Sequence, residues 1–287
     1  RGTLLPARVV RPVSGVLAHL FAAPVVFLAA LVVAVGDLWL LATADLAGAL
    51  TTVLVSPGAT LALLGALLGS TVVHELGHAA ACTAGGGRPG RIGVGLYVVY
   101  PAFFTDVTDS YRLDRAARVR TDLGGVYFNA LTIVALTGLY AVTGHPIALV
   151  ALLLVHLEAI QQLLPLGRLD GYFVLADLAG VPDLFGRIGP ILRSAVPGRP
   201  TAPKVAQLRP AARRWVIAWV GSCVPVMVGL LGWALWHVPA MAGQVWRLGT
   251  YCLLTDGALD LLSNLLILFF LGARLERVWG TGRFLLL

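Results

Sequence analysis

The sequence predicts an all-α polytopic membrane protein with six transmembrane helices and a short membrane-embedded β-like loop. Hydrophobic residues make up 58% of the 287 residues and charged residues only 12%, whereas about a quarter of a soluble domain is charged. The apolar residues gather in segments close to the length of about 20 residues that a membrane-spanning helix needs. We count six such segments: Val16–Thr43, Ala59–Cys82, Gly124–Thr143, Pro146–Leu164, Trp215–Trp236 and Gly257–Leu271.

The basic residues predict how these segments are oriented. Twenty of the 21 Lys and Arg residues fall in segments 1–15, 83–123, 165–214 and 272–287, and the exception is Arg247. Six spans place these four segments on one side, and basic residues are retained on the cytoplasmic side of a membrane. We therefore expect a multi-pass protein of the cell membrane with both termini in the cytoplasm. The net charge of +7 then reflects topology, so we expect a lipid bilayer and no nucleic acid as partner.

The same pattern divides the chain into four parts. We expect a cytoplasmic lead-in over residues 1–15 and a transmembrane catalytic core with spans one to four over residues 16–180. A connection rich in Pro and Arg over residues 181–214 is typical of a cytoplasmic linker. Residues 215–287 are predicted to form a C-terminal transmembrane hairpin.

The second span carries the motif His74-Glu75-Leu76-Gly77-His78. Two histidines four residues apart on a helix share one face and can bind one metal ion. Glu75 stands where a carboxylate can take a proton from metal-bound water. Ionisable residues are costly at membrane depth unless they act together, which favours a functional centre. The alternative is a chance pattern on a packed helix.

The segment after the second span is predicted to be extended. Arg91–Tyr100 is rich in β-branched and aromatic residues and is bounded by Gly and Pro. It follows the motif directly, so it either pairs with an extended substrate beside the metal or forms a packed hairpin that plugs the cavity. Asp106 and Asp109 have the chemistry of metal ligands, but we favour turn caps.

Polar residues in the third and fourth spans are further candidates. Asn129 lies one turn inside the membrane, where it either bonds a neighbouring helix or holds a substrate backbone. The paired glycines Gly124 and Gly125 allow another helix to approach closely. For His156 and Glu158 we weigh internal hydrogen bonding against a role as a gate.

Asp170 is the candidate third metal ligand. A catalytic metal commonly has three protein ligands and one open position, and the histidines supply two. Asp170 lies where a proline and two glycines break the helix after the fourth span. Irregular backbone at membrane depth is tolerated only where protein or a wet cavity surrounds it. The alternative is an ordinary Asp-Gly turn at the membrane boundary, and the spacing alone leaves both open.

The motif followed by Leu169-Asp170-Gly171 resembles the site-2 protease family of intramembrane zinc metalloproteases. The resemblance implies that His74, His78 and Asp170 bind zinc and that Glu75 is the general base. Residues 125–129 are similar to a G-P-x-x-N pattern of related enzymes, with Val126 in place of the proline, which implies a substrate-binding role for Asn129.

Two further segments narrow the resemblance, which is strongest over residues 59–190. Residues 100–106 and 168–177 are similar to the peptide zinc metalloprotease branch, found with peptide-maturation and export systems. Gln162 departs from the family pattern, in which an asparagine is common at that position. No PDZ or CBS domain is recognisable.

These observations predict an intramembrane zinc metalloprotease, a hydrolase of the zinc metalloendopeptidase class. Its cofactor would be zinc, and its substrate a membrane-embedded or membrane-delivered peptide or protein. Partners in peptide export or maturation are expected from the resemblance. One alternative is a catalytically silent membrane protein that binds peptides or assists export. A metal transporter is a third, but its acidic and histidine groups would be spread over several spans.

Overall fold

The chain is a helical membrane protein with several candidate spans. A computed structural model describes residues 2–97, 100–164, 169–180, 184–195, 205, 210, 213–219, 221 and 229. Within these residues, four helices are long and apolar enough to cross a membrane: α2 (Ala23–Thr43), α4 (Pro57–Ala84), α6 (Gly124–Thr143) and α7 (Pro146–Leu163). The predicted span Trp215–Trp236 is described only in part, and Gly257–Leu271 lies outside the described residues.

The first predicted span is divided into separate helices. Helix α1 (Ala7–Leu17) and the 3-10 turn η1 (Ala18–Phe21) precede α2. Ala22 between them is extended, and Pro24 stands in the first turn of α2, a position that tolerates proline because its missing N–H has no helical partner. The predicted boundary at residue 16 therefore falls inside α1.

The predicted loop after the first span contains another helix. Helix α3 (Leu46–Leu54) begins at Asp45, whose carboxylate accepts a hydrogen bond of 2.9 Å from the Gly48 N–H and so caps the helix. Buried side chains of α2, α3, α4 and α7 form an apolar core at this end of the molecule: Leu40, Ala49, Val53, Leu63, Leu149, Val150, Ala151 and Leu152. This core anchors the ends of the helices away from the motif.

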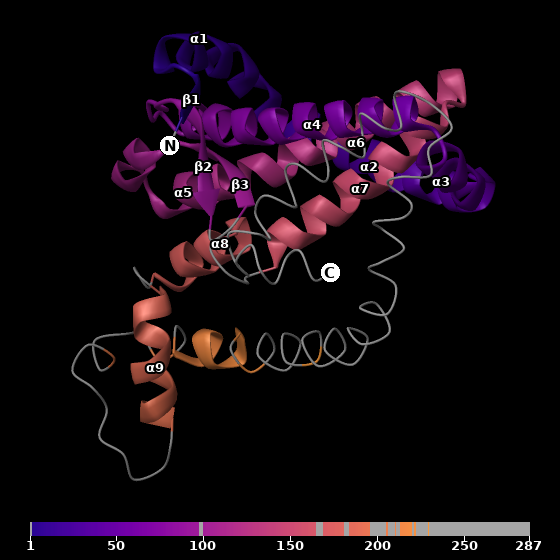
Figure 1. Cartoon of the computed structure of the whole chain (residues 1–287). Helices are drawn as coiled ribbons and strands as arrows, with labels where there is room; N and C mark the ends of the chain where they lie inside the picture. The colour runs from indigo at the N-terminus through magenta and orange to yellow at the C-terminus, as the bar shows by residue number, and fades with distance from the viewer. Residues whose placement is uncertain are drawn as a thin grey trace, which may run out of the picture.

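Helix α4 is the element that the others surround. It packs against α1, α5 (Arg115–Asp122), α6 and α7; α1, the sheet and α5 gather around one of its ends, and α3 lies at the other (Figure 1). A Cβ at Gly77 would overlap the Gly124 carbonyl, and a Cβ at Gly124 would overlap the Gly77 carbonyl. The close helix approach predicted from the glycines is confirmed, and it brings α6 directly against the motif.

A small antiparallel sheet lies against the motif-bearing end of α4. Strands β2 (Ile92–Tyr97) and β3 (Tyr100–Thr105) form a hairpin with Val94 opposite Phe103. The predicted extended structure is confirmed. Strand β1 (Gly2–Leu5) pairs with the other edge of β2, a pairing that the sequence analysis did not predict.

The remaining described elements complete the surroundings of the site. The 3-10 turn η2 (Thr108–Arg112) follows the sheet, and α8 (Asp170–Ala179) is the next described helix after α7. Helix α9 (Leu184–Ala195) lies within the predicted linker, so the described part of that linker is helical. Helix α8 packs against α5 and α7, which brings its first residue toward α4.

Candidate functional site: a buried histidine and aspartate cluster

The structure brings the three predicted ligand residues together. His74 and His78 on α4 are 2% and 8% exposed, and their Nε2 atoms are 3.2 Å apart. Asp170, the first residue of α8, places its Oδ2 atom 3.2 Å from His74 Nε2 and 3.4 Å from His78 Nε2. We call these three residues the His-His-Asp cluster.

Hydrogen bonds behind the histidines determine which ring atoms face the cluster. His78 Nδ1 donates to the Thr121 carbonyl oxygen at 2.8 Å, in the last turn of α5, where carbonyls lack helical partners. His74 Nδ1 lies 3.3 Å from Asn129 Oδ1. Both acceptors are oxygens, so each neutral ring carries its proton on Nδ1 and presents an Nε2 lone pair. Two imidazole lone pairs and a carboxylate oxygen thus face one another.

This arrangement of acceptors fits a divalent cation. Among the described residues, the buried Oδ2 atom of Asp170 has no hydrogen-bond partner, and burying such a group without a partner is costly. Ligand bonds of about 2.0–2.1 Å at tetrahedral angles separate ligand atoms by roughly 3.3 Å, and the three separations here are 3.2–3.4 Å. A Cβ at Gly125 would overlap Nε2 of both histidines, so only glycine leaves this space open.

Glu75 lies beside the cluster and has a defined partner. Its side chain is 8% exposed, and its Oε2 atom accepts a hydrogen bond of 2.6 Å from the Thr105 hydroxyl at the end of β3. Thr105 is not among the residues predicted from the sequence. The usable signal was the extended segment that directly follows the motif, because such a segment can fold back against the motif helix.

Asn129 occupies a position between α6 and the cluster. It is fully buried, its Oδ1 atom faces His74 Nδ1, and its Nδ2 atom has no hydrogen-bond partner among the described residues. The observed contact therefore orients a histidine. The predicted substrate-binding role depends on the remaining N–H groups.

Asp106 and Asp109 are turn residues, as predicted. Asp106 Oδ1 accepts from the Thr108 hydroxyl at 2.7 Å and from the Thr108 N–H at 3.2 Å. Asp109 accepts from the Arg88 N–H at 2.8 Å and pairs with Arg112. The Arg88 hydrogen bond, and then Arg112, hold the pKa of the Asp109 carboxyl below its ordinary value.

Two carboxyl groups near the cluster have shifted pKa values in opposite directions. Burial, reinforced by the charge of Asp177, raises the pKa of Asp122 from 3.8 to about 7. Burial would also raise the pKa of Asp170, but the positive charge that His78 and His74 carry when protonated outweighs burial and lowers that pKa. A buried carboxyl group here stays ionised only where a positive group compensates it.

A second histidine–carboxylate contact lies between the first and fourth spans. His156 Nε2 is 3.2 Å from Asp37 Oδ1, and its Nδ1 atom bonds the Leu152 carbonyl at 2.9 Å. The internal hydrogen bonding predicted for His156 is therefore confirmed. Its partner Asp37 was missed, although a carboxylate within an apolar span is itself a signal.

Comparisons with known proteins give two findings. A family model of the Rhomboid domain matches residues 242–287, which lie outside the described residues. The "Putative peptide zinc metalloprotease protein YydH" of Bacillus subtilis (strain 168) is 31% identical over 106 residues, 36% of this chain and 42% of that protein. The chain thus spans less than half the length of this curated relative. No solved structure matches.

The Rhomboid match corrects the functional assignment made from the sequence. Rhomboid domains belong to a family of intramembrane serine proteases, which need no zinc. On this finding, membership of the site-2 protease family and of its peptide zinc metalloprotease branch is wrong for the chain. The zinc metalloendopeptidase class, the zinc cofactor and the zinc-activated water are wrong as well. The similarity to YydH is partial and does not restore them.

The expectation of a membrane protease is consistent with the Rhomboid family. The predicted catalytic type was wrong because it rests on a resemblance that covers residues 59–190. Residues 215–287 contribute to that resemblance only through their hydropathy. Polar residues within and after the last apolar segment, such as Asn264, Arg274 and Glu276, were a signal that this part carries more than two plain spans.

Proposed function

We propose that this chain is a multi-pass membrane protein that takes part in intramembrane proteolysis and acts on a transmembrane-protein substrate. The Rhomboid domain match supports a membrane protease, and the four apolar helices support a location in the bilayer. In this proposal the chain has six spans, with the fifth and sixth in residues 215–287, and both termini lie in the cytoplasm. The distribution of Lys and Arg supports that orientation.

The described helices supply a buried polar centre for this function. We propose that His74, His78 and Asp170 together hold one divalent cation. The observation that carries this proposal is the convergence of two Nε2 lone pairs and one carboxylate oxygen within 3.4 Å of one another. A cation between these atoms replaces the repulsion among three acceptors by three attractions to the cation. These attractions are strongest in a poorly hydrated site.

We propose Glu75 as the catalytic proton-transfer residue of this centre. A carboxylate suits proton transfer, and the Thr105 hydroxyl holds its Oε2 atom in place. We propose Asn129 as the substrate-binding residue, because its Nδ2 donors have no partner among the described residues while its oxygen faces His74. A substrate backbone carbonyl is the acceptor that such an N–H group would bind.

Cleavage of a model substrate in a defined bilayer tests the proposal. The full chain would be reconstituted in nanodiscs with a fluorescent single-span protein, and the new termini identified by mass spectrometry. We expect cleavage within or next to the span, and Glu75→Gln should reduce its rate at least about 100-fold. Asp45→Asn, which changes only the cap of α3 at the far end of the fold, is the matched control and should retain cleavage.

The result separates two ways of being wrong. If no single-span substrate is cleaved by the wild-type chain, the proteolytic function fails. If the wild-type chain cleaves the substrate and Glu75→Gln cleaves it equally fast, the function stands but the role of Glu75 fails. A serine-directed reagent added in parallel measures the share of cleavage that belongs to the Rhomboid domain.

A further inference from the structure

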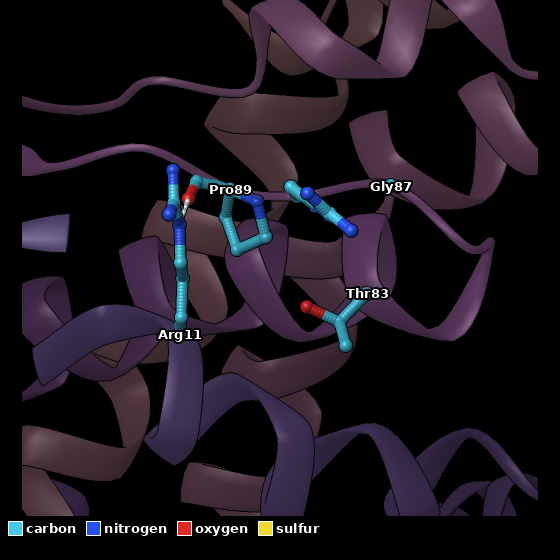
Figure 2. Close-up of a pocket in the computed structure, with 5 residues that line it drawn as sticks. Arg11, Thr83, Gly87 and Pro89 are labelled. Atoms are coloured by element: carbon cyan, nitrogen blue, oxygen red, sulfur yellow. Dashed lines mark hydrogen bonds between the residues drawn. The ribbon is translucent and has the colours of Figure 1, made fainter. Parts of the chain in front are cut away.

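A cavity lies apart from the His-His-Asp cluster, where α1 packs against the end of α4. Its volume is about 350 Å³, and its lining comprises Arg11 of α1, Thr83 of α4 and Gly87, Arg88 and Pro89 of the following loop (Figure 2). Small-molecule sites have volumes of roughly 300–1,000 Å³, so the cavity is large enough for a compact ligand.

Hydrogen bonds hold the walls of this cavity in place. Arg11 Nε donates to the Pro89 carbonyl oxygen at 3.1 Å (Figure 2). One turn further along α1, the Ser14 hydroxyl lies 2.9 Å from the Thr83 hydroxyl. Because α1 is tied in this way both to α4 and to the loop, the Arg11 guanidinium is positioned before any ligand binds.

The charges at the cavity call for a negative ligand. Within the part of the chain that the structure describes, neither Arg11 nor Arg88 forms an ion pair with a carboxylate. Asp109, which bonds the Arg88 backbone N–H, directs its side chain to Arg112 at 2.7 Å. Both arginines are exposed at the cavity, so their guanidinium groups are accessible to an anion, and guanidinium matches phosphate oxygens especially well.

The location of the cavity agrees with a phosphate at a membrane surface. It lies at the end of α4, a helix long and apolar enough to cross the bilayer. Helix α1 exposes Val9, Val13 and Val16 and carries arginines on other faces, a composition typical of a helix lying in the membrane interface. Basic pockets between helices at this depth bind phosphate-containing lipid headgroups.

We propose that this cavity binds a phosphate group, held by the guanidinium groups of Arg11 and Arg88. The phosphate belongs either to an anionic phospholipid headgroup or to a free phosphate. The binding does not depend on the His-His-Asp cluster, so it holds whether or not that cluster takes part in proteolysis.

Two arms of one experiment distinguish the sources. The full chain in detergent is titrated with inorganic phosphate, with sodium chloride at equal ionic strength as reference, and its Tm is followed. The full chain in nanodiscs of phosphatidylcholine with or without phosphatidylglycerol is examined for retained lipid by native mass spectrometry. Arg11→Gln and Arg88→Gln are compared with Arg115→Gln, which removes one exposed arginine from α5, away from the cavity.

We expect Arg11→Gln and Arg88→Gln each to weaken binding about tenfold or more, as the loss of a charge-assisted contact does, and Arg115→Gln to leave it unchanged. Retention of phosphatidylglycerol alone identifies a lipid site, and protection by phosphate as well identifies a general phosphate site; both support the proposal. If neither ligand binds, or if Arg115→Gln weakens binding as much as the cavity variants, the proposal is overturned. Arg88→Gln decides the matter should Arg11→Gln misfold, because the Arg88 side chain holds no described backbone group.

Discussion

The His156–Asp37 pair and the His-His-Asp cluster combine the same chemical groups with different outcomes. In both, an oxygen behind the ring engages Nδ1, so that Nε2 faces a carboxylate. The pair contains one Nε2 atom and one carboxylate, and a single shared proton satisfies both. The cluster contains a second Nε2 atom. A single proton can bridge only two of the three acceptor atoms, so one lone pair still faces another acceptor with no proton between them.

Exposure reinforces the difference. The side chains of His156 and Asp37 are 26% and 37% exposed, whereas those of His74, His78 and Asp170 are 3%, 10% and 15% exposed. A half-exposed pair can be solvated, but a buried set of acceptors has to be balanced from within. Residue types alone therefore do not identify a cation site; the number of acceptors that converge, and their burial, do.

The largest expected effect tests whether the cluster, and not the His156–Asp37 pair, binds the cation. His74→Ala combined with His78→Ala removes two of three ligands, so bound divalent cation should fall to background, because a lone carboxylate binds such cations weakly. His156→Ala removes a histidine of the same membrane region and should leave the cation content unchanged. Elemental analysis of the purified variants measures both. Equal loss of cation from His156→Ala would mean that the pair belongs to the same site.

The open space at Gly125 gives a second test of the ligand geometry in the cluster. Gly125→Ala places a Cβ against both Nε2 atoms, so cation affinity should fall at least about tenfold and the protein should lose about 1–3 kcal/mol of stability from overpacking. Gly138→Ala lies on the same helix with no atom within 4 Å of the new Cβ. It should be neutral or slightly stabilising. Isothermal titration and thermal unfolding measure the two effects, and unchanged affinity in Gly125→Ala contradicts the proposed ligand geometry.

The Thr105 hydroxyl allows a test of the role of Glu75, which lies beside the cluster. Thr105→Val keeps the shape but removes the donor to Glu75, and a lost hydrogen bond to a charged group costs about 1.5–3 kcal/mol. Substrate turnover should fall by roughly tenfold or more, since the carboxylate is no longer held. Thr108→Val removes an equivalent hydroxyl from the exposed Asp106 and should have little effect. Steady-state cleavage rates of the two variants test this, and equal rates remove Thr105 from the site.

Asp122 shows what a buried carboxyl group does outside the cluster. Its pKa is raised to about 7 in the folded protein, against 3.8 ordinarily. The folded state therefore binds this proton more tightly, and the resulting stability is complete below about pH 4 and is lost as the pH rises through 7. Asp122→Asn stays neutral, so it should match the wild-type Tm near pH 4 and exceed it by about 2–4 °C at pH 8.

Thermal unfolding at the two pH values checks this smallest effect. Asp45→Ala, which removes the cap of α3, should lower the Tm by similar amounts at both. A wild-type Tm difference between pH 4 and pH 8 that persists unchanged in Asp122→Asn would assign that difference to another group.

Features set by local sequence were predictable. The four-residue spacing of His74 and His78 requires only a helix, and the close contact at Gly124 requires only the absence of a side chain. The extended segment after α4 follows from its β-branched residues, and the Asp106 turn follows from its short side chain. In each case the decisive interaction lies within a few residues, or the residue type leaves one steric option.

Features set by distant contacts were not predictable in this way. The pairing of β1 with β2 joins residues about 90 positions apart, and no local pattern in Gly2–Leu5 predicts this pairing. The Asp37 and Thr105 contacts depend on how α2 and β3 pack against other helices. Asp170 was a candidate because it sits at a helix break, but only the packing of α8 on α5 and α7 decides where its carboxylate lies.

The cation content of Asp170→Asn tests the central claim most directly. Asparagine keeps the shape of aspartate but removes the charge, so affinity for a divalent cation should drop sharply at unchanged folding. Asp106→Asn makes the same chemical change in a turn outside the cluster. We expect about one divalent cation per chain in the wild type and in Asp106→Asn, and less than about a tenth of that in Asp170→Asn. A wild-type protein with no bound cation, or an Asp170→Asn variant that retains it fully, would contradict the account.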